Sequence, residues 1–195
     1  MNNKVKKWIN LDGITFLSKI SIKKGDIVVD FGCGSGHYSI PAAKIVSTEG
    51  KVYSIEKDKH TLDKLKQTVE EEGLSEVITT IKPESTNILK INLADNTANF
   101  VLVYDVLHYF TKNERKEIYK EIHRILKNDG ILSVYPKHNK SDWPIWNLAE
   151  MEVEDVVQEI IEMNFIFKNK QKFQLFHDEN NDTGNVLTFR KKIRK

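Results

Sequence analysis

One stretch of the chain decides the fold: Val28-Val29-Asp30-Phe31-Gly32-Cys33-Gly34-Ser35-Gly36-His37-Tyr38. It completes a β-branched run, 26–31, which predicts a buried strand, and it opens the segment 36–46, which predicts a helix. Pro41 lies near the first turn of that helix, where a missing N–H is tolerated. The glycines between strand and helix let the backbone approach a ligand without a Cβ in the way. Ligands bind at this carboxyl edge of parallel sheets, so the turn is a candidate site.

The alternation of strand and helix continues along the chain. Further strands are expected at 51–56, 77–81, 99–104 and 131–135. Helices are expected at 58–72 with Gly73 as the stop, from Thr111 to a stop at Asn128-Asp129-Gly130, and around 153–161. Thr111 and Glu114 have the spacing of a capping box at the start of the second of these helices. Two final runs, 165–176 and 185–193, flank the polar tip 178–184, a pattern typical of an antiparallel hairpin. These elements predict a mostly parallel sheet with helices on both faces.

Composition narrows the class of protein. The 195 residues carry a net charge of +2, so the chain lacks the basic field that supplies most non-specific nucleic-acid affinity. One cysteine excludes an intrachain disulfide and a cysteine-based zinc cluster. The longest uninterrupted apolar run, Phe100 to Tyr104, is much shorter than the ~20 residues of a membrane span. No apolar leader segment is visible at the start, so a cytoplasmic protein is expected.

Glu56 is the expected partner of the glycine turn. It ends the second predicted strand, 20 residues after Gly36, where a carboxylate can accept hydrogen bonds from both ribose hydroxyls of an adenosine. The plainer alternative is a solvent-exposed glutamate at a strand end. The dinucleotide fingerprint would require a third glycine at position 37, which is His37, and no Gly-Lys-Ser/Thr follows as in a P-loop. An NAD-type site and a P-loop are therefore both disfavoured.

Three separated segments resemble the class I S-adenosylmethionine-dependent methyltransferases, especially those that act on small molecules. The glycine turn with Asp30 two residues before it is similar to motif I of that family. The segment 103–110 resembles the family's fourth-strand region, and 124–133 resembles its turn into the fifth strand, with Asn128-Asp129 in place of Pro-Gly. The resemblance covers about residues 25–136. It implies a Rossmann-like, doubly wound, seven-stranded α/β sheet with a C-terminal antiparallel hairpin.

The resemblance also implies a domain organisation. The whole chain, 1–195, is expected to form one methyltransferase domain. Within it, 1–24 would be an N-terminal helical cap and 25–136 the cofactor-binding core. The remainder, 137–195, would supply an acceptor-side loop, a helix and the hairpin.

The cofactor implied by the resemblance is S-adenosyl-L-methionine, which leaves as S-adenosyl-L-homocysteine. Asp30 would hold the methionine amino group, and Glu56 would bind the ribose. The other expected contacts are Gly32, Cys33 and Gly34 against the methionine part, Lys57 beside the adenine, Glu84 or Ser85 at the adenine amine, and Tyr104 or Asp105 at the methionine end. Positions 84–85 depart from the Gly-Asp that the family usually has there.

Candidate acceptor-side residues follow the fourth and fifth strands. His108 is a candidate general base because its ordinary pKa of ~6.5 suits proton transfer near neutral pH. A structural histidine bonded to the backbone is the competing interpretation. Tyr109 and Asp105 are similar candidates for the base. Tyr109, His138, Trp143 and Trp146 are candidate substrate-binding residues. The last two lie in the irregular stretch 136–150, whose length is typical of a functional lid, although both indoles could simply cover the sheet edge.

The predicted function is methyl transfer to a small-molecule acceptor. The alternatives are an RNA or protein methyltransferase and a non-catalytic S-adenosylmethionine-binding protein. No metal is expected, because histidines and carboxylates show no metal-ligand spacing along the sequence. Neither nucleic acid nor membrane is an expected partner, and the sequence does not fix an oligomeric state.

Overall fold

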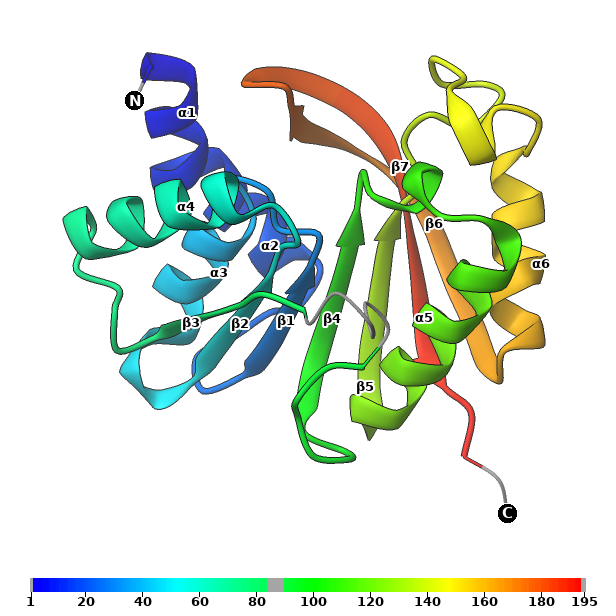
Figure 1. Ribbon diagram of the computed structural model, residues 1–195, viewed down its shortest axis with the longest axis horizontal. Coiled ribbons are helices and arrows are strands. Elements are labelled where there is room, and N and C mark those ends of the chain that lie inside the picture. Colours follow the sequence, from blue (N-terminus) through cyan, green and yellow to red (C-terminus); the bar gives the residue numbers. More distant parts are fainter. Residues whose placement is uncertain (1, 84–89, 194–195) are drawn as a thin grey trace. The chain divides into compact units, whose positions relative to one another are not determined.

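A computed structural model describes residues 2–83 and 90–193 of the protein (Figure 1). The strands are β1 (Ile27–Phe31), β2 (Lys51–Ile55), β3 (Ile78–Ile81), β4 (Ala98–Tyr104), β5 (Leu126–Tyr135), β6 (Phe165–His177) and β7 (Asn180–Lys191). The α-helices are α1 (Asn3–Lys7), α2 (Gly13–Lys19), α3 (Ser39–Val46), α4 (Lys59–Glu71), α5 (Lys112–Ile125) and α6 (Val153–Glu162). Shorter helical turns are η1 (Trp8–Asp12), η2 (Ser47–Glu49), η3 (Leu107–Tyr109) and η4 (Trp146–Leu148).

The seven strands follow the order β3-β2-β1-β4-β5-β7-β6 in one sheet. Strands β1, β2 and β3 pair in parallel, as do β4 and β5, whereas β5 and β7 are antiparallel. This arrangement confirms the predicted α/β class, the seven strands and the antiparallel C-terminal pair. Among residues 2–83 and 90–193, no helix combines the length and apolar character that crossing a membrane requires.

The chain folds as two compact units. The first contains residues 1–84 and 173–183, and the second contains residues 85–172 and 184–195. Each unit therefore combines an α/β segment with part of the C-terminal hairpin.

In the first unit, helices cover the short parallel strands β1 to β3. Helix α3 contacts all three strands, and its apolar residues, from Ile40 to Val46, are largely buried. Helix α4 buries Leu62, Leu65 and Val69, which the spacing of three and four residues places on one face. The helix begins where the Asp58 side chain accepts a hydrogen bond from the amide of Thr61, and it ends just before Gly73, which has a φ of 68°. The sequence predicted this helix and its glycine stop correctly.

The N-terminal segment of the first unit is helical and packs on the residues just after the glycine turn. Nε1 of Trp8 donates a hydrogen bond to the carbonyl oxygen of His37 at 2.7 Å. The Trp8 ring stacks on Phe176 with centroids 5.3 Å apart and meets the edge of Tyr38 at 5.5 Å. The Tyr38 hydroxyl donates to the carbonyl of Phe176 and accepts from its amide. Tyr38 is therefore a core residue.

In the second unit, α5 packs on β5 and on α6. Thr111 and Glu114 form the capping box that the sequence predicts, each satisfying a backbone amide of the other residue. The helix buries Ile118, Ile122 and Ile125. The two helices are joined by a buried, two-pronged ion pair between Arg115 and Glu159, with Nε and Nη2 at 2.7 and 2.8 Å from the two carboxylate oxygens.

Three predicted boundaries were wrong. Helix α3 begins at Ser39 rather than at Gly36, whose φ of 86° lies outside the right-handed helical region. Helix α5 ends at Ile125, and β5 begins at Leu126. Register shifts from Ala98↔Leu126 to Phe100↔Ile131, so the Asn-Asp-Gly segment bulges from the strand instead of stopping a helix.

The hairpin tip was the third error. The turn consists of two residues, Asp178 and Glu179, with φ values of 46° and 60°. Such a turn matches the twist of the strands that it joins, so β7 pairs from Asn180 onward through most of the segment predicted as a tip.

Candidate functional site

The glycine turn of the first unit is tied to the end of β2. The amides of Gly32 and Cys33 both donate to the carbonyl oxygen of Ile55, at 2.9 and 3.0 Å. Gly32, Gly34 and Gly36 have φ values of 77°, 51° and 86°, which residues other than glycine rarely adopt. The conformation of the turn therefore requires glycine at each of these three positions.

Glu56 closes the turn from the next strand. Its Oε2 accepts a hydrogen bond from the amide of Gly34 at 3.1 Å, and its Oε1 accepts one from the amide of Asp58 at 2.8 Å. A carboxylate offers about four lone-pair positions, so each oxygen can accept a further hydrogen bond. A Cβ built on Gly34 would meet no atom within 4 Å. The backbone at Gly34 is thus approachable beside a carboxylate, while Lys57 follows in an exposed position.

Asp30 is buried beneath this turn, with only 2% of its surface exposed. Its Oδ2 accepts a 2.6 Å hydrogen bond from the hydroxyl of Ser39, which in turn accepts one from Ser54 at 2.8 Å. Burial raises the pKa of Asp30 to about 6, opposed by the Ser39 hydrogen bond and assisted by the charge of Glu56. The site therefore holds a carboxylate whose charge lacks a cationic partner among the contacts of the described chain. A bound ammonium would stabilise that charge.

Cys33 lies in the same turn, and its surroundings favour the protonated thiol. Its thiol is buried and lies 3.7 Å from the carbonyl oxygen of Gly34, to which it donates. Burial, followed by the charges of Asp30 and Glu56, raises the pKa of Cys33 well above its usual value. The thiol stays protonated, so Cys33 can contribute shape to this site but no thiolate.

Tyr104, expected at the methionine end of the cofactor, ends β4 in the second unit. Its hydroxyl lies 2.7 Å from that of Ser133 on β5, and the side chain is buried. Glu84 and Ser85, expected at the adenine amine, lie outside the described residues. The remaining cofactor-side predictions, Asp30, Gly32, Cys33, Gly34, Glu56 and Lys57, all fall at the carboxyl ends of β1 and β2.

Aromatic residues gather after β4 and β5 in the second unit. The His108 ring, 2% exposed, lies 4.1 Å from the Tyr109 ring and 5.3 Å from Trp146, measured between centroids. Tyr109 and Trp146 are 50% and 60% exposed and lie 4.9 Å apart. The side-chain amide of Asn147 donates to the carbonyl oxygen of His108, which joins η3 to η4. Large exposed aromatic faces beside a buried imidazole suit a flat organic acceptor.

The loop 136–150 is fixed by hydrogen bonds of its own. Nδ1 of His138 lies 2.9 Å from the carbonyl oxygen of Trp143, and the rings of His138 and His108 are 4.6 Å apart. The buried ammonium of Lys137 binds the carboxylate of Asp142 at 2.8 Å. Trp143 itself is 78% exposed and makes its contact to His138 through the backbone. The structure thus brings His108, Tyr109, His138 and Trp146 together, and leaves the Trp143 indole at the surface.

Sequence reasoning missed two features of these sites. Ser39 and Ser54, which hold Asp30, sit in a helix start and a strand interior, where no motif marks them. Asp105 lies 3.4 Å from His138 and 3.7 Å from His108, although the two histidines are 30 residues apart in sequence. The parallel pairing of β4 and β5 is the signal that could have joined them.

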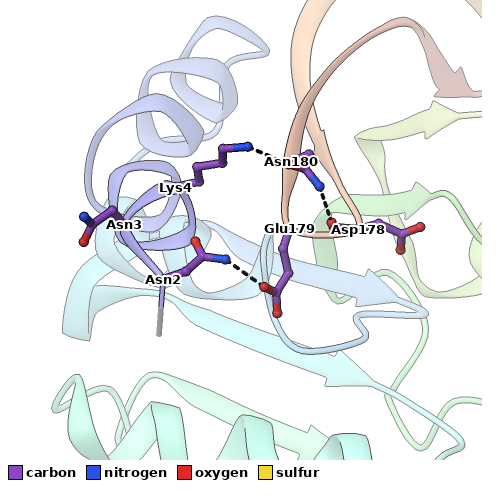
Figure 2. A pocket seen from close by; sticks show the side chains of 6 residues that line it. All are labelled: Asn2, Asn3, Lys4, Asp178, Glu179 and Asn180. Atoms are coloured by element: carbon purple, nitrogen blue, oxygen red, sulfur yellow. Dashed lines mark hydrogen bonds between the residues drawn. The ribbon is translucent and has the colours of Figure 1, made fainter.

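The first unit also has a polar hollow of about 400 Å³ between α1 and the hairpin tip (Figure 2). Asn2 binds Glu179 and Lys4 binds Asn180 across it, as Figure 2 shows. Both hydrogen bonds are 2.7 Å long. Asn3 and Asp178 complete the lining. Asn2 and Lys4 thus already bind groups on the other side of the hollow, and none of the predicted site residues lines it.

Comparisons with known proteins point to one family. Residues 28–130 match the family described as the methyltransferase domain. The chain is 40% identical over 73 residues, 37% of each chain, to a probable cobalt-precorrin-6B C(15)-methyltransferase (decarboxylating) of Saccharolobus solfataricus. It is 29% identical over 119 residues to a demethylmenaquinone methyltransferase of Geobacillus stearothermophilus, covering 59% of this chain and 47% of that one. The chain thus spans less than half the length of these curated relatives.

Solved structures support the fold over nearly the full chain. A crystal structure of a SAM-dependent methyltransferase from Aquifex aeolicus superposes with a TM-score of 0.72 at 21% identity, covering 95% of this chain and 96% of that one. At 21% identity this similarity establishes the fold of the chain and nothing more specific.

Proposed function

Because the chain belongs to the methyltransferase-domain family, the class I S-adenosylmethionine-dependent methyltransferases, we propose that it transfers a methyl group from S-adenosyl-L-methionine to a small-molecule acceptor. The observation that carries the proposal is the glycine turn with Glu56 bonded to Gly34 and Asp30 buried beneath it. This is the arrangement of groups that an amino acid joined to a nucleoside requires: a buried anion, an open backbone and an acceptor carboxylate.

Each group has a distinct task in the proposed complex. The Asp30 carboxylate binds the methionine ammonium, directly or through water, and the backbone at Gly32 and Gly34 lies against the methionine part. Glu56 accepts hydrogen bonds from the ribose hydroxyls, with Lys57 beside the adenine. The whole chain, 1–195, works as one methyltransferase domain, with 25–136 as cofactor core and 137–195 on the acceptor side.

The chemistry is an in-line displacement at the methyl carbon. The acceptor's lone pair forms the new bond while the carbon–sulfur bond breaks, and the sulfur leaves as the neutral thioether of S-adenosylhomocysteine. Since the sulfonium is already a good leaving group, the protein acts chiefly by orientation, which can supply roughly 7–11 kcal/mol. An acceptor that carries a proton also needs a base, for which His108 is the proposed residue.

A small, flat acceptor is proposed on the exposed rings of Tyr109 and Trp146, with His138 beside them and Trp143 at the surface. The curated relatives support a small molecule, since the two described above are named for methylation of cobalt-precorrin and of demethylmenaquinone. The near-neutral charge of the chain also favours a small acceptor over RNA.

Two measurements test the proposal. Calorimetry should detect S-adenosylhomocysteine binding at one site and no comparable binding of NAD; the reverse result would overturn the cofactor assignment. Labelled S-adenosylmethionine should then transfer label to a small-molecule extract and leave the RNA and protein fractions unlabelled. Label that enters RNA or protein would replace the acceptor class, and cofactor binding without transfer to any fraction would indicate a non-catalytic binding protein.

A further inference from the structure

Three residues of the second unit bring together atoms that transition metals prefer as ligands. Asp105 follows β4, His108 lies in η3, and His138 follows β5; one ligand atom from each lies within 4.8 Å of the other two. Because β4 and β5 are parallel, their carboxyl ends lie at the same edge (Figure 1). We propose that Asp105, His108 and His138 bind a divalent transition-metal ion such as Zn²⁺.

His138 is oriented as a metal ligand is. Its Nδ1 lies 2.9 Å from the carbonyl oxygen of Trp143, and because a carbonyl only accepts hydrogen bonds, Nδ1 carries a proton. In the neutral ring the lone pair is then on Nε2, which faces Oδ1 of Asp105 at 3.4 Å. A backbone carbonyl that fixes the tautomer and the ring in this way is the usual outer partner of a metal-binding histidine.

The distances between the three groups suit an ion between them. Oδ1 of Asp105 is 3.4 Å from Nε2 of His138 and 3.7 Å from Nδ1 of His108, both longer than the usual 2.7–3.2 Å of a direct N–H···O hydrogen bond. Two ligands held at about 2.0–2.1 Å from a tetrahedral ion lie roughly 3.4 Å apart. Small side-chain movements would therefore complete the coordination of one ion.

Burial and backbone conformation support a built site. His108 and His138 are 2% and 6% exposed, so both imidazoles are held away from bulk water. Asp105 and His138 have φ values of 53° and 69°, which cost energy in residues with a Cβ. The fold maintains these conformations, and they aim both side chains at the same point.

The donor set selects the class of ion. Two imidazole nitrogens and one carboxylate oxygen suit Zn²⁺, Fe²⁺, Co²⁺ or Ni²⁺, whereas Mg²⁺ and Ca²⁺ prefer oxygen ligands alone. Three protein ligands leave at least one coordination position open, as in catalytic zinc sites. If the proposed methyl transfer holds, that position would take an oxygen of the acceptor as it lies against Tyr109 and Trp146. The ion would then take the place of His108 as a base by favouring the deprotonated form of that oxygen, since a coordinated imidazole has no lone pair left to accept a proton. Metal binding itself does not depend on that role.

The test uses the full chain, stripped with a chelator and then dialysed. Zn²⁺ titration by calorimetry should show one equivalent bound, and Co²⁺ should give the visible absorption bands of a site with nitrogen and oxygen ligands. His138→Gln and Asp105→Asn should each weaken Zn²⁺ binding at least about 100-fold. His177→Gln is the matched control, because His177 lies 3.2 Å from Asp178 but belongs to no group of three such ligands among residues 2–83 and 90–193; it should bind as the unmodified chain does.

Absence of saturable Zn²⁺ and Co²⁺ binding would overturn the proposal and indicate that the three residues form direct ion pairs instead. Equal binding by His138→Gln and the unmodified chain would also overturn it. Circular dichroism and the melting temperature, measured on the same samples, verify that each variant is folded. S-adenosylhomocysteine binding is measured beside them. It separates the two proposals, since failure of cofactor binding with intact metal binding would count against the methyltransferase function alone.

Discussion

The amide of Gly34 donates a 3.1 Å hydrogen bond to Oε2 of Glu56, so the first residue after β2 fixes the glycine turn that follows β1. The same carboxylate accepts a second hydrogen bond at the start of α4, from the amide of Asp58. A ligand that binds Glu56 would therefore meet an acceptor already oriented by two backbone amides. Glu56 thus holds the glycine turn in place and also offers a carboxylate to a ligand.

Glu56→Ala should weaken S-adenosylhomocysteine binding about 10- to 150-fold, because hydrogen bonds to a charged group contribute roughly 1.5–3 kcal/mol. Glu70→Ala, an exposed substitution on α4, should leave the affinity unchanged. Calorimetry at fixed pH measures both. Equal affinities for the two variants would show that another carboxylate binds the ribose.

Asp30→Asn should separate stability from binding. Folding raises the pKa of Asp30 from 3.8 to about 6, so the folded state binds this proton more tightly than the unfolded state. The stabilising contribution of Asp30 is therefore greatest below pH 4 and is lost as the pH rises through 6. Removing the charge should raise the free energy of unfolding of the ligand-free chain at pH 7 by about 1–3 kcal/mol, which urea denaturation measures. Asp129→Asn, on the surface, is the control.

Cofactor affinity should show the opposite pH dependence. A protonated Asp30 cannot pair with an ammonium, so S-adenosylhomocysteine should bind progressively more weakly as the pH falls from 7 to 5. In Asp30→Asn the affinity should be weaker at pH 7 and nearly flat over this range. A flat profile in the unmodified chain would mean that Asp30 does not hold the amino group.

Two glycine substitutions should differ in cost although both residues have a positive φ. Gly73→Ala places its Cβ where no atom lies within 4 Å, so only the backbone conformation costs energy, about 1–2 kcal/mol. In Gly36→Ala the Cβ would also approach Cδ1 of Leu65, so the loss of unfolding free energy should be larger by about 1–3 kcal/mol. Chemical denaturation of both variants gives the difference; a smaller loss for Gly36→Ala would contradict it.

The Arg115–Glu159 pair should be expensive to break from one side. Glu159→Gln leaves a buried guanidinium without its counter-charge, and a loss of about 3–5 kcal/mol is expected. The double variant Arg115→Met/Glu159→Leu should recover most of that loss, because it removes both charges. Asp63→Asn, in an exposed pair with Lys59, should leave the stability nearly unchanged, because solvent screens such a pair. Thermal denaturation of the unmodified chain and of the three variants measures these differences in stability.

The sequence predicted the local elements well where one residue type imposes the conformation. The capping box at Thr111 and the stop at Gly73 depend on contacts within a few residues, so they are readable from a single chain. The end of α5 could not be read, since Leu126 continues the helical spacing and only pairing with Ala98 on β4 assigns it to a strand. The turn at Asp178 likewise depends on how the two long strands pair.

The candidate sites divide in the same way. Gly34 and Glu56 are candidates that the spacing of one motif indicates, and the structure shows them hydrogen-bonded to each other. Asp105 and His138 come together only because β4 and β5 run in parallel, and a spacing search along the chain therefore indicated no metal site. A site whose residues are far apart in sequence can be predicted only once the order and direction of the strands are known.

The two hydrogen bonds between Tyr38 and Phe176 have a consequence for synthesis on the ribosome. These partners are separated by 138 residues, so the core around Trp8 cannot close until the hairpin has emerged. At about 5–20 residues per second, Tyr38 waits roughly 7–28 s for its partner. During that interval the aromatic face of the nascent N-terminal helices is uncovered, which makes it the part of the chain that a chaperone would be expected to bind.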